Sequence, residues 1–128
     1  MKSFYLVLTL LFGVLMVAGG ISHFVFPEMY DAFLPEFLPR RPLNLLGGAA
    51  EIAVGIGVWI PRFRPAAALG ILVLMVAFLP LHVIDVFREQ PVIGSFQAAL
   101  IRLPVQLLLI AWAWAIYAAA RRRRDTPA

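Results

Sequence analysis

Four apolar stretches take up most of this chain, and each is long enough to cross a lipid bilayer. They cover residues 4–22, 44–60, 65–86 and 100–119. A helix of about 20 apolar residues spans the roughly 30 Å of hydrocarbon in a bilayer. A soluble domain of 128 residues could not bury a sequence that is 62% hydrophobic and 14% charged, because small domains have much surface for their volume. The sequence therefore predicts an integral membrane protein.

All four stretches are expected to be helices, because lipid offers no hydrogen-bond partners to unpaired backbone groups. Pro61 and Pro65 enclose a short connection between the second and third stretches, and proline interrupts helices. These two stretches should therefore be antiparallel neighbours. The predicted fold is all-α, a bundle of four transmembrane helices that forms one domain over residues 1–128.

The connection between the first and second stretches is the longest, and it carries a short amphipathic pattern. Tyr30, Phe33 and Phe37 recur at helical spacing, with acidic residues on the opposite side. This pattern predicts a short interfacial helix on the outer membrane surface, bent by Pro35 or Pro39. Such a segment could be a simple apolar cap or a lid that controls access of a ligand.

The basic residues indicate the orientation of the bundle. With the N-terminus inside the cell, seven of the eleven Lys and Arg side chains lie on the cytoplasmic side: Lys2, Arg62, Arg64, Arg121, Arg122, Arg123 and Arg124. Because positive charge collects on that side of membrane proteins, both termini are predicted to be cytoplasmic. The terminal arginines are expected beside lipid headgroups, so membrane lipids are predicted partners and nucleic acid is not. A cleavable signal peptide is an alternative interpretation of the first stretch, which follows Lys2 and ends in small residues.

Glu51 breaks the apolar pattern of the second stretch. An isolated carboxylate within a membrane is costly, so this one must be protonated, paired or exposed to a wet cavity. Gly47, Gly48 and Gly55 lie three or four residues from Glu51 and share its helical face. Small residues let helices pack closely in membranes. The spacing therefore predicts that Glu51 points into the bundle.

Other polar residues are expected at a similar depth, in the outer half of the bundle: His23, His82, Asp85, Arg102 and Gln106. One interpretation is an outward-facing site, at which Glu51, Arg102, Gln106, His82 and His23 hold a polar head group or transfer a proton. The other is a structural network in which Arg102 neutralises Glu51. His82 could also pair with Asp85. No metal site is predicted, because the two histidines lack ligand spacing and the chain has no cysteine.

Four short motifs are spread along the chain: Ala18-Gly19-Gly20-Ile21-Ser22-His23-Phe24 before Pro27, Gly47-Gly48 with Glu51 and Gly55, Pro61-Arg62, and Arg102-Leu103-Pro104-Val105-Gln106. Together they resemble the DoxX family of small bacterial membrane proteins, over nearly the whole chain. The resemblance implies a four-helix protein of the bacterial inner (cytoplasmic) membrane, associated with thiosulfate and quinone oxidation or with oxidative-stress complexes. His82 departs from the family pattern, in which an asparagine is expected at this place.

The preferred functional hypothesis joins the polar residues to this resemblance. The chain is expected to be a redox-associated accessory subunit with an outward-facing pocket for a quinone-like or other amphipathic molecule. The resemblance thereby implies a bound, non-covalent quinone as cofactor and a membrane or peripheral oxidoreductase as partner. Two alternatives stay open: a small transporter component with Glu51 as its proton or substrate site, and a structural subunit that binds other membrane proteins through its glycine faces.

Overall fold

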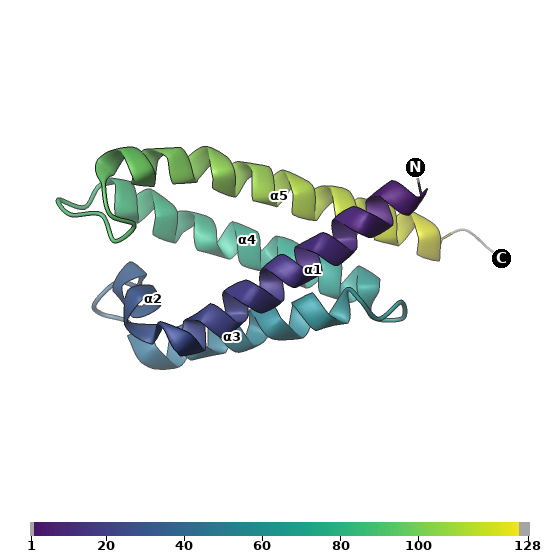
Figure 1. Ribbon diagram of the computed structural model, residues 1–128, viewed down its shortest axis with the longest axis horizontal. Coiled ribbons are helices and arrows are strands. Elements are labelled where there is room, and N and C mark those ends of the chain that lie inside the picture. The colour runs from purple at the N-terminus through teal and green to yellow at the C-terminus, as the bar shows by residue number, and fades with distance from the viewer. Residues whose placement is uncertain (1, 126–128) are drawn as a thin grey trace.

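The computed structural model describes residues 2–125, and over those residues it contains five helices and no strand (Figure 1). The helices are α1 (Lys2–Val25), α2 (Pro27–Phe33), α3 (Arg40–Gly57), α4 (Arg64–Val86) and α5 (Phe96–Arg124). The all-α fold class is confirmed for this part of the chain. The predicted domain also includes residues 1 and 126–128, which lie outside the described residues.

The four long helices run along the molecule in alternating directions (Figure 1). α1 packs mainly against α3 and α4 mainly against α5, while α3 and α4 join the two pairs. The start of α1 and the end of α5 lie at one end of the molecule with the turn between α3 and α4, which we name the terminal end (Figure 1). The short helix α2 and the loop between α4 and α5 lie at the other end, which we name the α2 end (Figure 1).

Helices α1, α4 and α5 are long and apolar enough to cross a membrane. Many of their exposed side chains are large and apolar, among them Val7, Leu11, Val73, Val76, Leu107 and Leu108. Such a surface indicates a membrane protein. The fourth predicted span is not confirmed by the same standard. Helix α3 begins with Arg40 and Arg41 and holds Glu51 in its middle, so it is less apolar than the other three.

Helix α2 confirms the predicted short helix in the first long connection. It ends at Phe33, and Leu34 has an extended backbone, as expected for a residue that precedes a proline. Tyr30 and Phe33 lie within the helix, where their rings contact His23 and His82. Phe37 lies beyond the helix and is 86% exposed. The predicted stripe of three aromatic residues is therefore wrong at Phe37.

The other helix boundaries follow local sequence signals. The turn between α3 and α4 contains Pro61, and α4 begins at Arg64 with Pro65 in its first turn. This confirms the short connection and the antiparallel arrangement of α3 and α4. Helix α5 begins after Ser95, whose hydroxyl accepts a hydrogen bond from the backbone N–H of Ala98 at 3.1 Å. A side-chain cap of this kind satisfies one of the free donors at a helix start.

The apolar core lies toward the terminal end. Its buried members come from α1, α4 and α5 and from the residue that follows α3: Phe12, Met16, Val58, Ala67, Ala68, Ile71, Met75, Ala113 and Ile116. The rings of Phe12 and Trp112 pack with centroids 4.5 Å apart, which joins α1 to α5. The buried side chains that make polar contacts between helices lie nearer the α2 end than this core does, among them His23, Asn44 and Gln106.

Helices α1 and α3 approach each other through two pairs of glycines. A Cβ atom added at Gly20 would lie 2.6 Å from the carbonyl oxygen of Gly48, and one added at Gly48 would lie 2.9 Å from that of Gly20. At Gly13 and Gly55 an added Cβ would lie 2.9 Å from the other residue's carbonyl oxygen. These distances are too short for any side chain. The prediction of a close helix contact at Gly48 and Gly55 is therefore confirmed.

Candidate functional site

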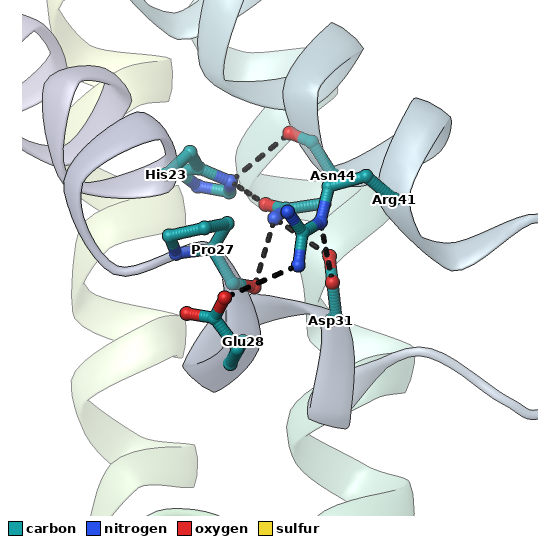
Figure 2. Close-up of polar contacts among 6 residues, drawn as sticks. All are labelled: His23, Pro27, Glu28, Asp31, Arg41 and Asn44. Carbon is teal, nitrogen blue, oxygen red and sulfur yellow. Dashed lines mark hydrogen bonds and ion pairs between the residues drawn. The ribbon is translucent and has the colours of Figure 1, made fainter.

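His23 lies in the last turn of α1, where it is buried and fixed by Asn44 of α3 (Figure 2). Its Nδ1 atom is 2.5 Å from the side-chain oxygen of Asn44 and 3.1 Å from the backbone oxygen of the same residue. Both oxygens are acceptors, so Nδ1 must carry the proton and donate it. The hydrogen bonds of Asn44 therefore fix the orientation of the imidazole and leave Nε2 to face the bundle.

Nε2 of His23 faces Glu51, which lies on the same side of α3 as Asn44. The Oε2 atom of Glu51 is 3.4 Å from Nε2. Glu51 is only 7% exposed, and its Oε2 atom is buried without a hydrogen-bond partner. Gly19 of α1 also lies against this oxygen, since an added Cβ there would lie 3.2 Å from Oε2, closer than an ordinary contact. Oε2 is therefore enclosed between His23 and the side-chain-free position Gly19.

Chemically, Nε2 of His23 and Oε2 of Glu51 lie within ion-pair distance, but no hydrogen bond joins them. With Nδ1 as the donor to Asn44, one further proton on the pair can sit on Glu51, which leaves the imidazole neutral, or on Nε2, which makes an ion pair. The two forms have the same net charge but opposite hydrogen-bonding character at Oε2. A group placed beside Oε2 can therefore either donate to the carboxylate or accept from the carboxylic acid.

A chain of polar contacts connects His23 to the surface through Asn44, Asp31 and Arg41 (Figure 2). The amide nitrogen of Asn44 donates to Asp31 at 2.8 Å and to the backbone oxygen of Pro27 at 3.1 Å. Arg41, which is exposed, donates to the other carboxylate oxygen of Asp31 at 2.7 Å. Partial loss of water raises the pKa of Asp31, but the hydrogen bonds from Arg41 and Asn44 outweigh this effect and hold the pKa below its ordinary value. Asp31 therefore stays charged and fixes the Asn44 amide.

Tyr30 covers the outer side of His23. The two rings are stacked with centroids 3.9 Å apart and an interplanar angle of 23°. Helix α2, which carries Tyr30, is held at its end by two arginines. Arg40 donates to the backbone oxygen of Leu34 at 2.7 Å, and Arg88 to that of Phe33 at 3.3 Å. Hydrogen bonds from Arg40 of α3 and from Arg88, which follows α4, thus hold the end of α2 against both helix pairs. Through Tyr30, α2 covers one face of the His23 ring.

Gln106 lies in the other helix pair. It is fully buried on α5, and its amide nitrogen donates to the backbone oxygen of Met75 on α4 at 2.6 Å. Met75 directly precedes Val76, whose carbonyl loses its helical donor because Pro80 has no N–H. The oxygen Oε1 of Gln106 is buried without a partner. Gln106 therefore ties α5 to the irregular part of α4.

Arg102 does not neutralise Glu51. None of the ion pairs among residues 2–125 includes Arg102, and its Nη1 atom is buried without a hydrogen-bond partner. The reason is the helix pairing, because the glycine contacts place α1 beside α3, whereas α5 packs on α4. The carboxylate of Glu51 accordingly faces a histidine of α1.

His82 and Asp85 do not form a pair either. His82 is half-buried, and its ring meets the ring of Phe33 edge-on at 5.7 Å. Asp85 accepts hydrogen bonds from the backbone N–H groups of Val92 at 2.7 Å and Ile93 at 3.3 Å. Its role is therefore to shape the loop between α4 and α5.

Of the five residues predicted for a ligand or proton site, the structure thus brings His23 and Glu51 together. Arg102, Gln106 and His82 belong to the α4–α5 pair. The sequence analysis missed Asn44, Asp31 and Arg41. A signal for Asn44 was present, since Asn44, Gly48, Glu51 and Gly55 recur at intervals of four, three and four residues, and this spacing defines one helical face. Within residues 2–125, no group of three or more potential ligand side chains could hold a metal ion.

Comparison with known protein families gives a match over most of the chain. A family described as Domain of unknown function (DUF8561) matches residues 11–117, which include His23, Asn44 and Glu51. No curated protein and no solved structure matches the chain. The resemblance to the DoxX family stays a prediction.

Proposed function

The chain belongs to the DUF8561 family, and we propose that it is a four-span inner-membrane protein that binds the polar head of a quinone-like or other amphipathic molecule at the His23–Glu51 pair. In this proposal it serves as an accessory subunit of a membrane or peripheral oxidoreductase. The association with a redox partner rests on the resemblance to the DoxX family. The binding site rests on the geometry of the pair.

The observation that carries the binding proposal is the buried Oε2 atom of Glu51, which has no hydrogen-bond partner. A buried polar atom without a partner is unfavourable by about 1–3 kcal/mol, and more when it is charged. A ligand hydroxyl that reached Oε2 would supply the missing donor. A ligand carbonyl at the same atom would accept a hydrogen bond from the carboxylic acid form. Quinols and quinones present these two groups, so the pair suits both forms of such a ligand.

Four spans are supported by the course of the chain. Helices α1 and α4 run in the same direction (Figure 1), so the chain must return between them, and α3 is the helix that does so. Its 18 residues extend about 27 Å at 1.5 Å per residue, close to the thickness of the hydrocarbon layer. Arg40 and Arg41 would then lie at the membrane surface, and the one charged residue of α3 left inside the membrane would be Glu51 beside His23.

The proposed orientation can be tested by labelling. The chain has no native cysteine, so single Glu36→Cys and Asp125→Cys variants each give one thiol. We expect a membrane-impermeant maleimide to label intact cells at position 36, because the loop with α2 is outside, and to label position 125 only after the cells are opened. Labelling at 125 but not at 36 in intact cells would reverse the orientation.

The proposed ligand site can be tested with a short-chain ubiquinol, whose hydroxyl would donate to the carboxylate, and the purified protein in detergent. We expect Glu51→Gln to raise the Kd by about ten- to hundredfold, because a hydrogen bond to a charged group contributes about 1.5–3 kcal/mol. Glu36→Gln is the matched control, since it makes the same chemical change on a side chain that is 92% exposed. Its Kd should equal that of the unmodified chain. An unchanged Kd in a folded Glu51→Gln variant would contradict the proposal.

A further inference from the structure

A groove of about 700 Å³ lies at the terminal end, between the first turns of α1 and the last turns of α5. Its lining residues are Lys2, Tyr5, Trp114, Ala115, Ala118, Ala119, Arg122 and Arg123. The guanidinium of Arg123 donates to the backbone oxygen of Lys2 at 2.5 Å. This bond joins residues from the two ends of the described chain and holds the two helices together at the groove.

The lining combines three kinds of side chain, each of which suits one part of a phospholipid. Lys2, Arg122 and Arg123 supply positive charge, and arginine binds phosphate oxygens through paired N–H donors. Tyr5 and Trp114 are aromatic residues of the kind that gather at the level of lipid headgroups, and Trp114 is 59% exposed. The alanines of α5 form a smooth, apolar wall.

We propose that this groove binds the phosphate of an anionic glycerophospholipid, with the start of an acyl chain against the alanine wall. Basic pockets between membrane helices are suited to anionic headgroups. A lipid fits better than a free phosphate because the groove is lined by apolar as well as charged atoms and includes the exposed ring of Trp114. The site lies at the end opposite α2, so it does not depend on the proposed function of the His23–Glu51 pair.

A defined site in the groove should respond differently to substitutions than diffuse attraction of lipid to a basic tail would. Arg122 lines the groove, whereas Arg124 lies in the same run of arginines but outside the groove. We expect Arg122→Gln to reduce the retention of phosphatidylglycerol by about fivefold, since one basic residue near anionic lipid contributes about 1 kcal/mol. Arg124→Gln should leave retention unchanged. Ala118→Phe, which fills the groove without changing the charge, should reduce retention by a similar factor.

The measurement is native mass spectrometry of the purified full chain in detergent with added phosphatidylglycerol, and with phosphatidylcholine in a parallel sample. Selective retention of phosphatidylglycerol, lost in Arg122→Gln and kept in Arg124→Gln, supports the site. Equal losses in both arginine variants would show diffuse attraction to the tail and overturn the proposal. Equal retention of the two lipids would also overturn it, as would displacement of phosphatidylglycerol by millimolar inorganic phosphate, which would assign the groove to free phosphate.

Discussion

Gly48→Ala should destabilise the protein by about 1–3 kcal/mol, the usual cost of forcing extra atoms into a packed contact. The added Cβ would lie 2.6 Å from the Cβ of His23 and 2.9 Å from the backbone oxygen of Gly20. Neither atom is the end of a flexible side chain, so α1 and α3 would have to move apart. Unfolding in mixed detergent–SDS micelles gives the free energy that checks this value.

The adjacent residue provides the control for this substitution. An added Cβ at Gly47 would meet only the Cε1 atom of His23, at 4.0 Å. Alanine is favoured over glycine within a helix by about 0.5–1 kcal/mol, so Gly47→Ala should be neutral or slightly stabilising. If both variants unfold alike, α1 and α3 do not pack through Gly48, and the placement of His23 beside Glu51 loses its support.

Properties of the chain that depend on local sequence were predictable. The helix lengths follow from apolar stretches, and the turn between α3 and α4 follows from Pro61 and Pro65, whose effects act within a few residues. The inward direction of Glu51 followed from glycines on its own helical face. Each of these inferences needs only one element and its neighbours along the chain.

The partner of Glu51 was not predictable in the same way, because it depends on which helix lies beside α3. The depth of Arg102 in its predicted span made it a plausible partner, yet depth alone does not choose between α1 and α5. The choice is made by Gly13 and Gly20 on α1, which match Gly48 and Gly55 on α3 across the contact. Small residues at matching intervals on two helices are visible in a sequence, but their register becomes evident only when the helices are placed together.

The role of Asn44 is not predictable from the sequence for a related reason. A polar residue at the first position of a predicted span fits the pattern of an ordinary interfacial residue. In the structure it is 2% exposed and connects three elements, since it accepts from His23 of α1 and donates to Asp31 of α2. These contacts depend on the path of the connection between α1 and α3, which places α2 beside the start of α3.

A double-mutant cycle between His23 and Glu51 should show strong coupling in stability. His23→Phe keeps the ring under Tyr30 but removes the ion-pair partner of the buried Glu51 carboxylate, which costs about 3–5 kcal/mol if the pair is charged. Glu51→Gln removes the charge. Each substitution alters the loss in free energy of unfolding that the other one causes. We therefore expect a coupling energy of about 0.5–3 kcal/mol, as found for residues in contact.

The parallel cycle between Arg102 and Glu51 is the control, because these side chains form no ion pair in the structure. Their effects should add to within about 0.3–0.5 kcal/mol. Strong coupling to Arg102 and none to His23 would mean that the carboxylate has its partner on α5, against the observed helix pairing.

The same variants also separate a structural pair from a binding site. If His23 and Glu51 couple strongly but ubiquinol binds equally well to every folded variant, the pair serves to hold α1 against α3. If binding is lost in Glu51→Gln while that variant remains folded, the Oε2 atom is the hydrogen-bond partner of the ligand. The same carboxylate then both pairs with His23 and binds the ligand, because its Oε2 atom lacks a hydrogen-bond partner within the protein.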